Sequence, residues 1–215
     1  MSTPTPGRPG RPRRTAAELA AERRRVAHEA LRLFALHGVA ATSADDVARA
    51  AGVSLRTFWR LFPRKEDAVR PLLEDGVATV AANVRARGVA GFRADGSPVP
   101  DEPLSSAEPV RTLVRLTRNE PAIRAAWLDV YDSAEAVFAD ALAVSRGETE
   151  PGLGTRTTAA VVNAALRVAV EEWAWRDSPA DALARLTDEA LRQAADALDG
   201  RADGPTRTAE ASRAD

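Results

Sequence analysis

The 215-residue sequence contains no cysteine, which excludes disulfide bonds and thiolate metal sites. Histidine is also scarce, and with only His28 and His37 we expect no zinc or iron cage. No run of about 18 apolar residues occurs, and the arginine-rich start lacks the apolar stretch of a secretion signal. The sequence therefore predicts a cytoplasmic protein with no metal, no cofactor and no membrane contact.

Residues typical of catalysis are also missing. His28 lies within a predicted helix without a nucleophile nearby, and no glycine-rich phosphate loop occurs. The paired acidic residues 45–46 and 171–172 are neighbours on predicted helices, so their carboxylates diverge and cannot flank one bond. We assign no catalytic residue and predict that the protein is not an enzyme.

The charge that is present is unevenly distributed. Residues 1–70 carry 14 basic and 7 acidic side chains, a net of +7. The remaining residues carry 16 basic and 24 acidic ones, a net of −8, and the two parts sum to the total of −1. A basic end joined to an acidic body is typical of a polyanion-binding module attached to a second domain.

Apolar residues recur with helical spacing along the chain, and no strand pattern occurs, so the sequence predicts an all-α fold. We divide it into a disordered basic arm (1–19), a three-helix head (20–80), a larger helical body for ligand binding and dimerisation (81–200) and a disordered tail (201–215). Pro71 interrupts the helical pattern of residues 64–88, which predicts a kink or a later helix start. Residues 88–103, rich in glycine and proline, are expected to form a link.

Residues 42–61 have the pattern of two short helices joined by a turn. Ser43 can cap the first helix, and Asp46 three residues later completes a capping box. Gly52 suits the turn, and Ser54 can cap the second helix. That helix carries Arg56, Thr57, Trp59 and Arg60, together with the expected core residues Phe58, Leu61 and Phe62. The layout is that of a helix-turn-helix, whose second helix reads the major groove of DNA.

The same region resembles the TetR family of transcriptional regulators. The resemblance covers about residues 20–80 and depends on Ala30, Phe34, Gly38, Thr42-Ser43, Val47-Ala48, Ala51-Gly52-Val53-Ser54, Thr57, Trp59, Phe62-Pro63 and Lys65-Glu66. Trp59 stands where the family usually has tyrosine, and Arg56 where a small residue is common, which points to altered operator contacts. The resemblance implies a helical ligand pocket and a two-helix dimer face. Residues 119–124 are similar to a subgroup associated with acyl-CoA-like ligands.

Several residues of the head are candidates for DNA contacts. Arg56 and Arg60 share one helix face, and each can donate two hydrogen bonds to a guanine. Thr57 and Trp59 suit phosphates or a thymine methyl group. Further candidates for phosphate contacts are Thr42 and Ser43 at a helix N-terminus, the cap Ser54, and Lys65 at the start of the next helix.

The arm contains Arg8, Arg11, Arg13 and Arg14 among prolines, a composition suited to the minor groove of A·T-rich DNA. The alternative is a solubilising tail. For the charged candidate residues on the predicted helices, the alternative is that they are solvated surface residues without a ligand.

The last two predicted helices are the candidate dimer face, since one head reads too few base pairs for specificity. Their small and apolar residues are Ala159, Ala160, Ala164, Ala165, Leu166, Ala169, Val170, Leu183, Leu186, Leu191 and Leu198. They could instead form intramolecular core.

Candidate pocket residues are Trp127, Tyr131, Phe138 and Trp173, with Arg118 or Arg124 for an anionic group. Ordinary packing is the alternative for each of them.

These observations predict a homodimer that binds double-stranded DNA as a repressor and is released from a near-palindromic operator by a small apolar or acyl-type effector. The alternative is a DNA-bound architectural or protein-recruiting module without a small-molecule ligand. An enzyme fused to a helix-turn-helix would need a catalytic constellation within residues 90–200, and none is found there.

Overall fold

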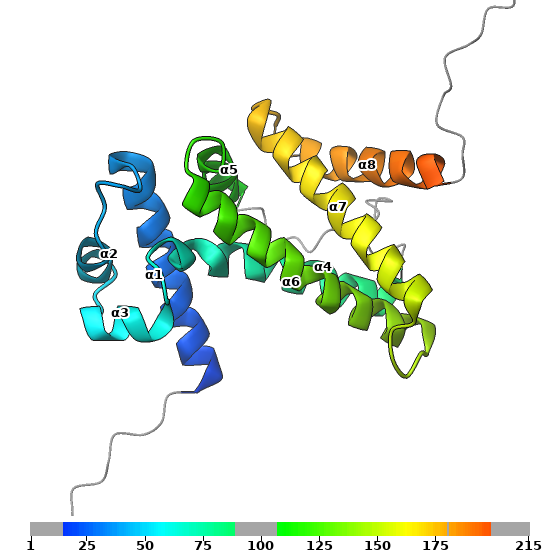
Figure 1. The fold of residues 1–215 in the computed structure, drawn as a ribbon, viewed down its shortest axis with the longest axis horizontal. Helices are drawn as coiled ribbons and strands as arrows, with labels where there is room; N and C mark the ends of the chain where they lie inside the picture. Colours follow the sequence, from blue (N-terminus) through cyan, green and yellow to red (C-terminus); the bar gives the residue numbers. More distant parts are fainter. Residues whose placement is uncertain (1–14, 89–106, 180, 199–215) are drawn as a thin grey trace, which may run out of the picture.

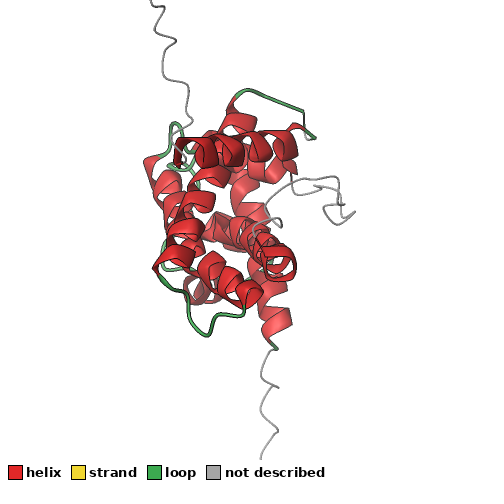
Figure 2. Ribbon diagram, turned by 90° about the vertical axis from the view of Figure 1, so that its right-hand side faces the viewer, coloured by secondary structure: helices red, strands yellow, loops and turns green. Residues whose placement is uncertain are grey.

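The computed structural model describes residues 15–88, 107–179 and 181–198, and the regular structure within these ranges is entirely helical (Figure 2). The all-α prediction is confirmed. The elements are α1 (Ala16–His37), α2 (Ala44–Ala50), α3 (Leu55–Leu61), the 3₁₀ turn η1 (Glu66–Val69), α4 (Arg70–Arg87), α5 (Ala107–Leu116), α6 (Pro121–Arg146), α7 (Leu153–Trp175) and α8 (Ala182–Leu198). Residues 1–14, most of the expected link and the expected tail lie outside the described residues.

Helix ends in the head follow the local sequence. Ser43 and Asp46 form the predicted capping box at the start of α2, and the Ser54 hydroxyl accepts from the Thr57 N–H at the start of α3. Gly38 ends α1 with a φ of +84°, and Gly52 forms the turn between α2 and α3 with a φ of +66°. Both angles lie in the region that favours glycine.

Pro71 determines where α4 begins. The chain forms the short turn η1 and then starts α4 at Arg70, so Pro71 falls in the first turn of the helix. A proline is tolerated there because the first backbone N–H groups of a helix have no intrahelical partner. The later start is therefore correct, and the segment from residue 64 onward is not one kinked helix.

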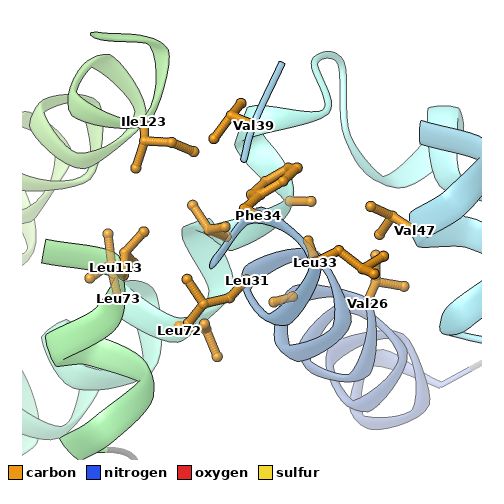
Figure 3. Packing of buried hydrophobic residues seen from close by; sticks show 14 of the residues in the cluster. Val26, Leu31, Leu33, Phe34, Val39, Val47, Leu72, Leu73, Leu113 and Ile123 are labelled. Carbon is orange, nitrogen blue, oxygen red and sulfur yellow. The ribbon is translucent and has the colours of Figure 1, made fainter. Parts of the chain in front are cut away.

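Head and body share one hydrophobic core. Figure 3 shows Val26 and Val47 of the head on one side of Phe34, with Leu113 and Ile123 of the body on the other. These side chains belong to a single buried cluster that also contains residues of η1 and α4. Rigid-body movement of the head would break this packing, so the two parts are mechanically linked.

The body is built around α6, which runs between α4 and α7 (Figure 1). A second apolar cluster, centred on Phe138 and Leu142 of α6, fills the end of the body remote from the head. Helix α8 packs along α7 and contributes Leu191 to this cluster. The interior of the body is thus divided between two clusters along the length of α6.

Candidate functional site

Helix α3 is held on the head by two aromatic anchors. Phe58 and Phe62 are buried, their ring centroids lie 5.5 Å apart, and both belong to the cluster that contains Val26 and Phe34. Leu61 packs against the same cluster while remaining partly exposed. The predicted core role is confirmed for Phe58 and Phe62, whereas Leu61 is only partly buried, and the two buried rings fix which face of α3 points outward.

The outward face of α3 is both cationic and apolar. Arg56 and Arg60 are exposed, and Trp59 is 48% exposed with its ring edge-on to Phe58 at a centroid distance of 5.2 Å. Leu55, which the sequence reasoning missed, is 40% exposed and lies one helical turn from Trp59. Its spacing of four residues from Trp59 was the signal available in the sequence. Guanidinium groups and apolar side chains thus stand together on one short helix.

Neither Arg56 nor Arg60 is engaged by a carboxylate within the part of the chain that the structure describes. Other arginines of the head are engaged: Arg24 donates to both carboxylate oxygens of Asp75, and Arg64 does the same to Asp67. The two arginines of α3 therefore keep their donors available for a ligand outside the molecule.

The residues at the start of α2 are already hydrogen-bonded. The Thr42 hydroxyl is buried and donates to the carbonyls of Leu33 and Gly38, so it anchors the α1–α2 turn. The Ser43 N–H and hydroxyl both contact Asp46, at 3.0 and 2.6 Å, and these bonds hold the pKa of the Asp46 carboxyl below its usual range. A phosphate at Ser43 would have to compete with that carboxylate.

Lys65 joins the end of the helix-turn-helix to its beginning. Its ammonium donates to the carbonyls of Val39, at 2.6 Å, and Thr42, at 2.8 Å. Two of its three hydrogens thus stabilise the α1–α2 turn, and one remains for the predicted phosphate contact. The arm residues Arg8, Arg11, Arg13 and Arg14 lie outside the described residues.

In the body, the structure brings together two of the predicted pocket residues. The rings of Trp127 and Tyr131 on α6 have centroids 4.7 Å apart. Trp127 is fully buried, and within the described ranges its indole N–H has no hydrogen-bond partner. Burial raises the pKa of the Tyr131 phenol above its usual value, and the nearby Glu171 carboxylate adds to that shift.

The other predicted pocket residues lie elsewhere in the body or already contact other residues of the chain. The Trp173 N–H donates to the Pro179 carbonyl at 2.9 Å, and the Arg111 guanidinium covers its ring at 4.1 Å. Phe138 belongs to the remote cluster, and Arg118 stacks on Trp175. Arg124 lies 4.0 Å from Glu171. Two surface hollows, one on the head beside His37 and one along α8, include none of the four predicted aromatic residues.

Sequence reasoning missed three polar residues of α7. Asn163 and Glu171 are buried, and Arg167 lies between them along the helix. The Asn163 amide donates to the Tyr131 carbonyl at 2.8 Å, and Arg167 pairs with Glu171 at 3.2 Å. Their spacing of four residues, in a segment (159–175) whose other residues are apolar except for Glu172, was a signal that these side chains share one face.

Comparisons with known proteins agree with this arrangement. Residues 27–70 match the family described as bacterial regulatory proteins, tetR family, and residues 101–199 match the MftR C-terminal domain. The HTH-type transcriptional regulator TcmR of Streptomyces glaucescens is 30% identical over 200 residues, covering 87% of each chain.

Two solved structures are also similar. A TetR-family transcriptional regulator from Mesorhizobium loti is 18% identical, with a TM-score of 0.48, and the match covers 86% of this chain and 98% of that one. Thermus thermophilus FadR, solved in complex with lauroyl-CoA, is 20% identical with a TM-score of 0.43, covering 89% and 100%. Among the described helices, none is long and apolar enough to cross a membrane. The chain belongs to the TetR family of DNA-binding transcriptional regulators, whose helix-turn-helix is formed here by α2 and α3.

Proposed function

We propose that the protein is a homodimeric repressor that binds a near-palindromic operator through α3 and leaves it when a small apolar or acyl-type effector enters the body. The observation that carries the operator-binding part is the outward face of α3. Arg56 and Arg60 stand there without carboxylate partners among the described residues, while Phe58 and Phe62 fix the helix to the core. Such a face can read guanines through paired hydrogen bonds.

The proposed dimer face lies on α7 and α8. Part of the predicted set is used within the chain, since Ala159, Ala165 and Ala169 are buried. Ala164 is exposed, and Val168, one turn further along α7, is 52% exposed. A small residue next to an exposed aliphatic one suits the close packing of a partner helix.

The effector is proposed to act on α6. Trp127 and Tyr131 of this helix are the proposed effector contacts, and the same helix carries Ile123 in the core shared with the head (Figure 3). An effector that binds better to one arrangement of α6 would shift the head between two positions relative to its partner. The effector can shift this conformational equilibrium only by the difference between its binding free energies for the two states.

The test begins with selection of operator sites from random DNA by the full-length protein, followed by footprinting. We expect two half-sites about one helical turn apart and a stoichiometry of two chains per site. Selection of a single half-site bound by one chain would contradict the homodimer, and failure to select any site would contradict operator binding.

The alternative function is a DNA-bound architectural or protein-recruiting module without a small-molecule effector. One observation favours it, the complete burial of Trp127 and Trp173 as ordinary core residues. A thermal-shift screen separates the two functions. A true effector raises the melting temperature and weakens operator binding together, because it binds the folded protein and prefers its released state.

A further inference from the structure

Several side chains with polar groups lie along the contact between α6 and α7. On α6 these are Arg124, Trp127 and Tyr131, and on α7 Asn163, Arg167 and Glu171; we call these six residues the α6–α7 seam. The two sides are in contact, because Asn163 donates to the Tyr131 carbonyl and Glu171 lies 4.0 Å from Arg124.

Two buried atoms of the seam, Trp127 Nε1 and Asn163 Oδ1, have no hydrogen-bond partner among the residues that the structure describes. The orientation of the Asn163 amide is fixed, because its Nδ2 faces a carbonyl oxygen and must be the donor. The indoles of Trp173 and Trp175, by contrast, donate to the carbonyls of Pro179 and Val114. Buried polar groups of folded proteins are nearly always paired, so an unused donor and an unused acceptor in one seam call for an explanation.

The hydrogen-bonding capacity of the two unpaired atoms, one donor and one acceptor, disfavours an anion there. Charge is not the reason, because the seam carries the guanidinium groups of Arg124 and Arg167 and the single carboxylate of Glu171, with which both pair. A carboxylate could accept from Trp127 Nε1 but has no hydrogen to donate to Asn163 Oδ1, so that buried oxygen would stay unpaired. An uncharged group carrying both an acceptor and a donor would satisfy Trp127 and Asn163 without that penalty.

We propose that the α6–α7 seam binds the polar end of the effector, and that the effector is an apolar molecule whose uncharged polar group both accepts and donates a hydrogen bond, such as a hydroxyl or a carboxamide. This inference rests on the proposed effector function and narrows it. Trp127 Nε1 would donate to the group, and Asn163 Oδ1 would accept from it.

The test uses four probes with the same ten-carbon chain: decanamide, 1-decanol, decanoate and decane. Their binding to the full-length protein is followed by calorimetry and by the indole N–H signals of the ¹⁵N-labelled protein, with the Trp127 signal assigned from W127F. Decanamide and 1-decanol should shift that signal and raise the melting temperature. Decanoate and decane should bind at least about tenfold more weakly, because each leaves a buried group unpaired.

Variants separate the seam from general packing. N163L removes the acceptor and should weaken decanamide binding about tenfold, whereas W175F alters a partly buried tryptophan of the same helix outside the seam and should leave that affinity unchanged. Should N163L fail to fold, the affinity of W127F for decanamide, expected to fall similarly, provides the same test.

Two outcomes would overturn the proposal. Tighter binding of decanoate than of decanamide would make the seam an anion site, and no shift of the Trp127 signal by any probe would make it closed core. Operator binding is measured on the same samples. Operator binding without a probe response rejects this inference alone, whereas a probe response without operator binding rejects the proposed function alone.

Discussion

Asp129 and Arg64 connect the body to the head: the Asp129 carboxylate on α6 lies 3.3 Å from Arg64 Nη2, just beyond the end of α3. Arg70 at the start of α4 approaches the same carboxylate oxygen at 3.4 Å. Asp129 lies on α6 between Trp127 and Tyr131, so a change at the proposed effector site is adjacent to this link. Together with the shared core around Phe34 (Figure 3), this link would connect the proposed effector site physically to the proposed operator-binding face.

The two carboxylates that Arg64 contacts should differ in their contribution to stability. Asp67 is only 7% exposed and accepts two hydrogen bonds from Arg64, at 3.0 and 2.9 Å, whereas Asp129 is 50% exposed. We expect Asp67→Asn to lower the free energy of unfolding by about 1–3 kcal/mol, and Asp129→Asn by less than about 1 kcal/mol. Urea denaturation of both variants checks this, and equal losses would contradict the assignment of Asp67 as the buried anchor.

The dimer face is tested by placing a charge on it. Val168→Glu should shift the protein from dimer to monomer in analytical ultracentrifugation, because a carboxylate buried between two copies would be unpaired. Val144→Glu is the matched control, since Val144 is also exposed but lies on α6. A dimer that survives Val168→Glu, or one that dissociates equally with Val144→Glu, would place the interface elsewhere.

The end of α7 should carry an acid-sensitive contribution to stability. Hydrogen bonding and charge from Arg115, assisted by Arg111, hold the pKa of Asp177 below its usual value. A lowered pKa in the folded state means that the stabilisation is present above the ordinary pKa of aspartate and is lost as the pH falls through the lowered one.

The variant Asp177→Asn should therefore melt below the wild type at neutral pH. The difference should shrink as the pH falls below about 4, the ordinary range of an aspartate. Asparagine tolerates the left-handed backbone of this position, where φ is +57°, so the substitution tests the charge. A melting difference that persists unchanged in acid would indicate a cause other than the ion pairs.

The basic arm is tested through the salt dependence of operator binding. Replacing Arg8, Arg11, Arg13 and Arg14 by alanine should reduce the slope of log K against log salt by up to about three to four, if each arginine releases one counterion. The affinity of the variant is measured on its selected operator between low and physiological salt. An unchanged slope would identify the arm as a solubilising tail.

The head was predictable from the sequence because its structure is determined locally. The signals that determine it lie within a few residues of each other. They are capping pairs such as Ser43 and Asp46, the glycines of the turns, and the placement of Phe58 and Arg60 on different faces of one helix. They therefore specify the helix ends and the outward face of α3 before any long-range contact is known. Leu55 escaped notice because a leucine in an amphipathic helix is more often core than surface.

The body was predictable as helices but not as a site. Aromatic residues with helical spacing indicate burial, yet spacing alone cannot show that Arg111 covers Trp173, or that the Trp127 N–H lacks a partner among the described residues. That distinction depends on contacts between residues more than 60 positions apart, such as Arg111 with Asp177. The burial of Asn163 likewise depends on how α7 packs against α6.

The central claim is that the outward face of α3 reads the operator, and it is tested by the binding of Arg56→Ala and Arg60→Ala variants to the selected operator. Each variant should bind that operator about 5- to 150-fold more weakly, with little loss on unrelated DNA. Arg85→Ala, an exposed arginine of α4, is the control and should bind as the wild type does. Unchanged specific binding by the double variant Arg56→Ala/Arg60→Ala would contradict the account.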